Sequence, residues 1–97
     1  MIISRADFLY RAALDQETLE VWIREEWLVP QGAAAEPEFT DADVARAGLI
    51  RNLQQDMGVN REGVGVILSL LDQIHGLRWA LSSRLRGSLP EEPAGDA

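Results

Sequence analysis

The side chains of this sequence that could do chemistry are first of all pairs of carboxylates. Glu25 adjoins Glu26, and Asp41 lies two residues before Asp43. Paired carboxylates serve as general acid and general base when they share an apolar cleft that shifts their pKa values. These pairs lie on polar faces or at helix starts, where a solvated surface is the favoured interpretation. We therefore expect that the protein is not an enzyme.

Metal and cofactor chemistry has few candidate ligands in this chain. There is no cysteine, so neither a disulfide nor a thiolate metal site can form, and the single histidine, His75, cannot complete a zinc site alone. His75 follows Asp72 by one helical turn without a nucleophile beside it, which favours a packed or surface histidine over a catalytic one. Gly63 and Gly65 lie inside a helical pattern, which favours close helix packing over phosphate binding. We expect no metal and no cofactor.

The charge of the chain is unevenly distributed. The 97 residues carry a net charge of −7, with eight acids and three arginines in residues 1–40 but two acids and four arginines in residues 61–87. An acidic N-terminal part repels phosphate backbones and suits a basic protein partner. The N-terminus lacks the features of a signal peptide, and the longest apolar run is too interrupted to span a membrane. We expect a soluble, cytoplasmic protein.

Helices are predicted to position these residues, and the fold class is all-α. Ser4 and Asp15 are suitable N-caps for two short helices, roughly residues 5–12 and 16–27, which a tight turn joins into a helix-turn-helix. On the second helix a core role is favoured over ligand stacking for two aromatic residues at helical spacing, Trp22 and Trp27.

The middle of the chain is predicted to be a loop followed by a third helix. Residues 31–38, QGAAAEPE, contain glycine and proline and no convincing strand. Thr40 and Asp43 then form a capping box, and Gly58 suits the left-handed position after the helix. The predicted buried stripe of this helix consists of Ala45, Leu49, Ile50, Leu53 and Met57.

A long helix from Asn60 to Arg86 is predicted to organise the remainder of the chain. Its apolar stripe continues beyond the reach of the preceding small domain, and pairing with a second copy would bury that stripe. We predict a head at 1–59, a helix at 60–87 that packs on the head and pairs between chains, and a disordered tail at 88–97. The predicted dimer interface consists of Ile74, Leu77, Leu81 and Leu85.

The order of these elements resembles the winged helix-turn-helix head of MerR-type regulators, over Ile3 to Arg86. Residues 18–30, TLEVWIREEWLVP, are similar to the MerR recognition helix and the turn after it, and Phe39 takes the place of the aromatic residue that closes the wing. The chain departs from that family where basic residues are usual, with Glu20 after Leu19 and with Pro37 and Glu38 before the wing aromatic. The resemblance therefore implies a degenerate wing, and the acidic second helix should bind DNA poorly.

A narrower resemblance is to the chaperone modulator CbpM family. The segments that carry it are WIREEWLVP at 22–30, ARAGLIRNL at 45–53, DMGVN at 56–60 and ILSLLDQIHGLR at 67–78. The resemblance implies binding to the J-domain of a DnaJ-like co-chaperone of the CbpA type, which would inhibit its work with the Hsp70 chaperone DnaK and could restrain its DNA binding.

The acidic head supplies a physical basis for that partner, because J-domains resemble one another in presenting a basic helix to DnaK. For Asp41 and Asp43, helix capping alone remains the favoured interpretation. A MerR-type DNA-binding transcription regulator is the main alternative, and a dimerisation module that binds neither partner is a third. Their negative charge and expected exposure are the grounds for choosing the candidate partner-binding residues, which are Glu17, Glu20, Asp41, Asp43, Asp56 and Asp72.

Overall fold

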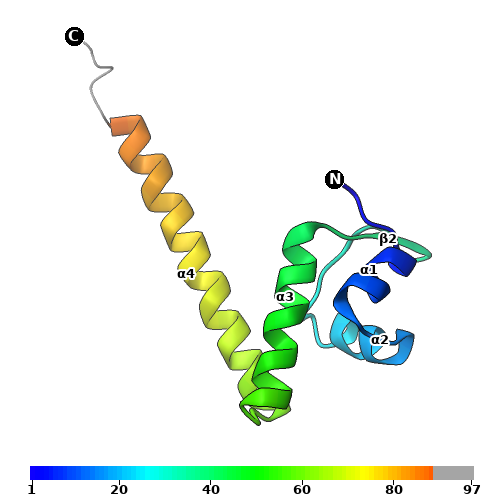
Figure 1. The fold of residues 1–97 in the computed structure, drawn as a ribbon. Helices are drawn as coiled ribbons and strands as arrows, with labels where there is room; N and C mark the ends of the chain where they lie inside the picture. Colours follow the sequence, from blue (N-terminus) through cyan, green and yellow to red (C-terminus); the bar gives the residue numbers. More distant parts are fainter. Residues whose placement is uncertain (89–97) are drawn as a thin grey trace. The chain divides into compact units, whose positions relative to one another are not determined.

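Helices make up most of the computed structural model, which describes residues 1–88, and one small hairpin interrupts them (Figure 1). The predicted mostly helical fold class is confirmed. Two compact units are present, Met1–Gly65 and the chain from Val66 onward, so the first turn of the long helix belongs to the head. The elements are α1 (Arg5–Ala12), α2 (Gln16–Arg24), β1 (Gln31–Ala33), β2 (Glu36–Glu38), α3 (Asp41–Arg51), the π-helical turn η1 (Asn52–Asp56) and α4 (Arg61–Ser88).

The helix-turn-helix forms where the caps predict it. The Ser4 Oγ accepts a hydrogen bond from the Asp7 N–H at 3.3 Å, and an Asp15 carboxylate oxygen accepts one from the Thr18 N–H at 2.7 Å. Between them Ala13 is left-handed with φ 56°, and the N–H of Leu14 donates to the Leu9 carbonyl at 3.0 Å. This bond closes α1 with a Schellman-type turn, which turns the chain into α2.

The second helix ends at Arg24 rather than at Trp27, so that predicted boundary is wrong. Glu26 adopts φ 63°, its N–H donates to the Ile23 carbonyl at 3.0 Å, and the Trp27 N–H donates to the Trp22 carbonyl at 2.9 Å. These are the two bonds of a Schellman motif, whose usual apolar contact is here the tryptophan pair, with ring centroids 6.2 Å apart. Both rings are buried, so their predicted core role is confirmed.

Residues 31–38 form an antiparallel hairpin, which corrects the prediction of a loop without strands. Gly32 pairs with Pro37 in the register, and the short turn consists of Ala34 and Ala35. A two-stranded hairpin of this length is marginal alone. It is anchored because Ile3 and Phe39 exchange backbone hydrogen bonds of 2.8 and 2.9 Å. The hairpin occupies the place of the wing, and we call residues 31–38 the wing.

The core of the head lies between the two short helices, the wing and α3. Phe8 and Phe39 stack with centroids 4.1 Å apart, and α1 packs on α3 and on β2. The predicted stripe of the third helix is partly wrong, because Ala45 and Met57 are exposed whereas Ala47 is buried. The buried apolar side chains of the head are Ile3, Phe8, Ala12, Leu19, Trp22, Trp27, Leu28, Phe39, Ala47, Ile50, Leu53 and Val64.

The connection from α3 to α4 confirms the predicted caps. After the π-helical turn, Gly58 has φ 67° and the Val59 N–H donates to the Leu53 carbonyl at 2.8 Å. The Asn60 Oδ1 then accepts a hydrogen bond from the Gly63 N–H at 2.8 Å, so Asn60 caps α4. A Cβ on Gly63 would lie 2.7 Å from a Val59 methyl carbon, so glycine is needed there for the connection to α4, whereas a Cβ on Gly65 would make only an ordinary contact of 3.8 Å with Trp27.

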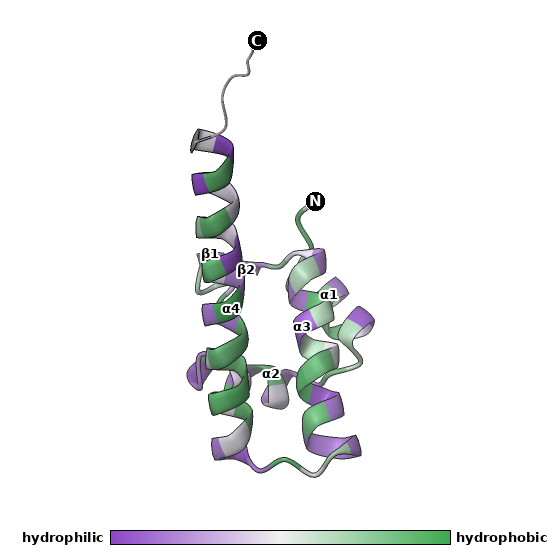
Figure 2. Ribbon diagram, turned by 90° about the vertical axis from the view of Figure 1, so that its left-hand side faces the viewer, coloured by the Kyte–Doolittle hydropathy of each residue, from purple (hydrophilic) through white to green (hydrophobic). Residues whose placement is uncertain are grey.

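The second unit consists of α4 beyond Gly65. The helix continues to Ser88, so the predicted tail begins one residue later, and the predicted disorder of 89–97 lies outside the described residues. Apolar residues recur along the whole helix (Figure 2). The predicted dimer residues are exposed in the single chain, at 44% for Ile74, 69% for Leu77, 58% for Leu81 and 53% for Leu85.

Candidate partner interface of the head

The surface of the head where a MerR-type regulator would meet DNA is formed by α2 and the wing. On α2 the side chains of Glu17, Glu20 and Arg24 are exposed, and on β2 those of Glu36 and Glu38 are exposed. Four carboxylates thus face solvent beside one guanidinium. A surface of this sign favours a cationic partner over a phosphate backbone.

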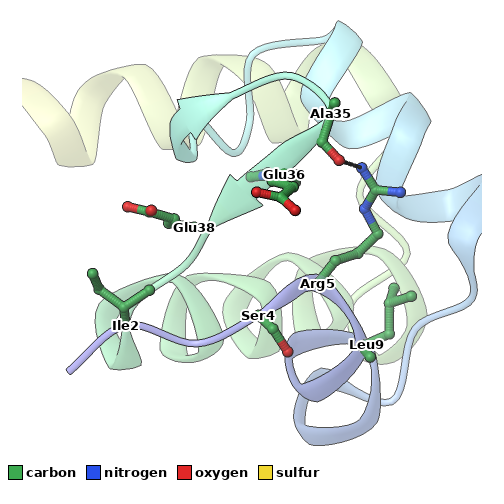
Figure 3. A pocket seen from close by; sticks show the side chains of 9 residues that line it. Ile2, Ser4, Arg5, Leu9, Ala35, Glu36 and Glu38 are labelled. Carbon is green, nitrogen blue, oxygen red and sulfur yellow. Dashed lines mark hydrogen bonds between the residues drawn. The ribbon is translucent and has the colours of Figure 1, made fainter.

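Two hollows border the wing. The larger, of about 610 Å³, lies between the start of α1 and β2. Figure 3 shows Glu36 and Glu38 on its β2 side and Ile2, Ser4 and Leu9 on its α1 side. The smaller, of about 280 Å³, is lined by α2 and the wing and shares two residues with the larger hollow, Arg5 and Pro37.

Arg5 fixes the wing from α1. One of its guanidinium nitrogens lies 3.4 Å from the carbonyl oxygens of both Ala34 and Ala35, the two residues of the turn, and Figure 3 shows the contact with Ala35. Both turn residues have negative φ, so the turn is not one of the primed types that suit a hairpin best. The Arg5 side chain thus supports a turn of unfavourable geometry, and its charge is directed at backbone carbonyls.

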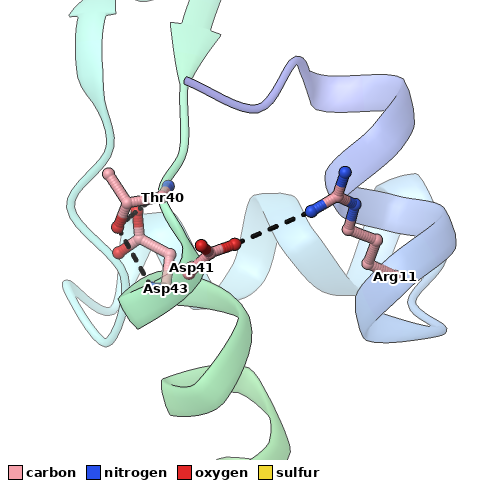
Figure 4. Close-up of polar contacts among 4 residues, drawn as sticks. All are labelled: Arg11, Thr40, Asp41 and Asp43. Atoms are coloured by element: carbon pink, nitrogen blue, oxygen red, sulfur yellow. Dashed lines mark hydrogen bonds and ion pairs between the residues drawn. The ribbon is translucent and has the colours of Figure 1, made fainter. Parts of the chain in front are cut away.

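Most of the other arginines of the head also have partners within it. Arg46 donates to the Trp27 carbonyl and Arg51 to the Ala12 carbonyl, at 2.5 and 3.1 Å. Arg11 pairs with Asp41 at 3.6 Å (Figure 4), and Arg61 forms an ion pair with Glu25. Within residues 1–88, the one head arginine without a hydrogen bond or ion pair is Arg24. Apart from Arg24, the arginines of the head therefore bind backbone carbonyls or carboxylates of the head itself.

The candidate acids of α2 and α3 have different surroundings. Glu17 is exposed on α2, and Glu20 accepts a hydrogen bond from the Gln16 amide at 3.0 Å. Asp43 forms the predicted capping box with Thr40, whose N–H donates to the Asp43 carboxylate at 2.9 Å (Figure 4). Asp41 pairs with Arg11 in the same view. Asp43 thus caps α3, as the capping interpretation predicted, whereas Asp41 forms an ion pair with Arg11 and no cap.

The six candidate acids do not form one patch. Asp41 lies at the start of α3 and Asp56 at the end of η1, so about 1.5 Å of rise per residue separates them by roughly 22 Å. Asp72 belongs to the second unit. Only Glu17 and Glu20 share the α2 surface, one turn apart.

Two acids of this surface, Glu36 and Glu38, were missing from the sequence-based candidates. The sequence predicts a loop at residues 31–38, so it assigns no face to these side chains. One sequence signal points to this surface: in this chain Pro37 and Glu38 occupy the positions where MerR-type wings usually have basic residues.

Two shifted pKa values mark structural contacts rather than a reactive centre. Hydrogen bonds from the Thr18 side chain and the Thr18 N–H lower the pKa of the Asp15 carboxyl. The hydrogen bond and the charge of Glu25 raise the pKa of Arg61. Among residues 1–88, no three acidic or histidine side chains are grouped so that they could hold a metal ion. In the same part of the chain no helix has the length and apolar character needed to cross a membrane.

Comparison with known proteins assigns the chain to a family. The family model described as MerR HTH family regulatory protein matches residues 3–86, a range that includes the helix-turn-helix, the wing, α3 and nearly all of α4. The searches of curated proteins and of solved structures found no match. Since the family model spans most of the sequence, this chain belongs to the MerR helix-turn-helix family of regulatory proteins.

Proposed function

We propose that this MerR-family protein is a chaperone modulator that acts by binding in the cytoplasm and has no catalytic activity. Its head binds the J-domain of a DnaJ-like co-chaperone of the CbpA type and inhibits the work of that co-chaperone with DnaK, and it can also restrain the co-chaperone's DNA binding. The observation that carries the proposal is the acidic surface of α2 and the wing, where Glu17, Glu20, Glu36 and Glu38 are exposed.

The charge of this surface argues against the usual activity of the family. Nonspecific DNA affinity comes mainly from lysine and arginine contacts with phosphates. Here the recognition-helix position after Leu19 is Glu20, and five of the six head arginines are engaged within the head. Binding to DNA would therefore bring carboxylates toward phosphates without enough free cations to offset the repulsion.

The same charge suits a basic protein surface. The head carries twelve acids and six arginines, a net charge of −6, and opposite fields accelerate encounter and orient the partners. The segments similar to the CbpM family support a J-domain as that partner, and they include the Schellman turn at residues 22–30 and the α3–α4 connection at residues 56–60. The proposal includes a homodimer, formed through the exposed apolar residues of α4.

Calorimetric titration with a purified J-domain of the CbpA type, at two salt concentrations, tests this function. We expect saturable binding that weakens as the salt concentration rises, because the attraction between exposed charges is screened. Absence of binding at tens of micromolar would contradict the proposal. Tight, salt-sensitive binding to a short palindromic duplex would instead support a DNA-binding transcription regulator, which the retained helix-turn-helix favours.

A further inference from the structure

We infer that the larger hollow beside the wing is the docking groove for a lysine- or arginine-rich amphipathic helix of the partner. The inference rests on the proposed function, which it deepens by naming the surface that receives the basic helix. We call this hollow the wing groove and define it by Ile2, Arg5, Leu9, Glu36, Pro37 and Glu38.

The wing groove combines an apolar lining with acids. Ile2 is 67% exposed although it is apolar, Leu9 is half-buried, and Pro37 of β2 is buried. Long cationic side chains cover such surfaces well, because their methylene groups lie on apolar atoms while the charged ends reach an acceptor. An anionic or purely apolar ligand would leave the acids without a partner.

The two acids are free to receive that charge. Glu36 and Glu38 form no ion pair within the described residues, and the nearest cation of the groove, Arg5, donates to the turn carbonyls instead. If Arg5 were paired with these two carboxylates, their attraction for a cationic helix would be much weaker. Here the arginine supports the groove and leaves the charge of the acids uncompensated.

The spacing of the acids fits a helix. Glu36 and Glu38 are two residues apart on β2 with Pro37 buried between them, so they lie on the same face of the strand, roughly 6.6 Å apart along it. Basic residues at positions i and i+4 of an α-helix are about 6 Å apart along its axis and share one face. One helix lying along β2 can therefore present one cation to each carboxylate.

The groove is held in one shape before any partner arrives. Arg5 fixes the turn, the Ile3–Phe39 bridge ties the end of β2 to the segment before α1, and Phe39 stacks on Phe8. Gly32 lies under the Glu38 side chain, since a Cβ there would be 3.3 Å from the Glu38 Cδ. Such preorganisation reduces the entropy lost on binding.

The test compares two double variants that remove equal charge from the head. Glu36→Gln with Glu38→Gln changes the wing groove, whereas Glu26→Gln with Glu62→Gln changes exposed acids after the end of α2 and at the start of α4. We expect the groove variant to raise the calorimetric Kd for the J-domain at least about tenfold and the control variant less than about threefold. Equal effects of the two variants would overturn the inference.

A second titration separates this inference from the function on which it rests. The probe is a synthetic amphipathic helix with lysines at i and i+4, added to the ¹⁵N-labelled full chain. We expect the largest amide shifts at residues 2–9, 35, 36 and 38, and no such shifts with a glutamate-bearing peptide of the same length. Failure of the J-domain to bind while these shifts occur would reject the proposed function and retain the groove. Shifts elsewhere, or none, would reject the groove.

Discussion

The head and the part of α4 beyond Gly65 differ in both charge and apolar exposure. The head carries a net charge of −6 and contains most of the buried apolar side chains, although Tyr10, Val29 and Met57 are exposed. Residues 66–88 carry one acid and three arginines, a net charge of +2 with His75 neutral. The long helix exposes leucines along its length. This difference is the basis of the two proposed modes of association, in which charge would direct the head to another protein and apolar area would direct the helix to its own copy.

Replacing two leucines of the apolar stripe of α4 should have the largest effect on the difference between the two regions. Leu77→Glu with Leu81→Glu places charge in the proposed dimer interface. Each leucine no longer buried there removes about 1.5–3 kcal/mol from the free energy of dimerisation. We expect a monomer at micromolar concentration in sedimentation while binding of the J-domain stays within about threefold. Trp79→Ala is the matched control, because Trp79 lies about 200° around the helix from Leu77. A wild-type chain that sediments as a monomer would contradict the dimer.

Removing a ring from the head core would damage the other region selectively. Phe39 is fully buried, stacks on Phe8 and forms the bridge to Ile3, so Phe39→Ala should lower the free energy of unfolding by about 3–5 kcal/mol. Urea denaturation followed by tryptophan fluorescence measures this, because Trp22 and Trp27 report on the head. Met57→Ala, at a position 69% exposed, should change the value by less than about 0.5 kcal/mol. Similar losses in both variants would show that the core is placed elsewhere.

The two regions also differ in how far the sequence predicts them. Helix starts follow from local chemistry, and the caps at Ser4, Asp15, Thr40 and Asn60 all form as predicted. The end of α2 could not be found in this way, because a glutamate occupies the left-handed position where glycine is the usual signal. Local signals thus locate an element reliably only when the residue type is the one that the backbone conformation favours.

The wing was missed because distant contacts create it. Its strands have three residues each and contain Gly32 and Pro37, both unfavourable in strands. Hydrogen bonds from Arg5 and Ile3, about 30 residues earlier in the chain, hold the hairpin in place. The candidate interface depends on this hairpin, so sequence reasoning identified the sign of its charge but not the groove residues Glu36 and Glu38.

The smallest expected effect concerns the pH dependence of the head. Hydrogen bonds from Thr18 lower the folded-state pKa of Asp15 below its usual value of 3.8, so this carboxylate stabilises the head above that pH and loses its contribution as the pH falls through the folded-state value. Asp15→Asn keeps a capping oxygen but does not titrate.

The stability difference between the wild type and Asp15→Asn should therefore be larger at pH 7 than at pH 3, as measured by urea denaturation. Glu17→Gln, in the same helical turn, controls for the loss of one negative charge. A difference that does not change with pH would mean that the charge of Asp15 does not contribute to the cap. Because Asp72 is the one acid in residues 66–88, self-pairing of α4 should respond less to the same acidification than the head does.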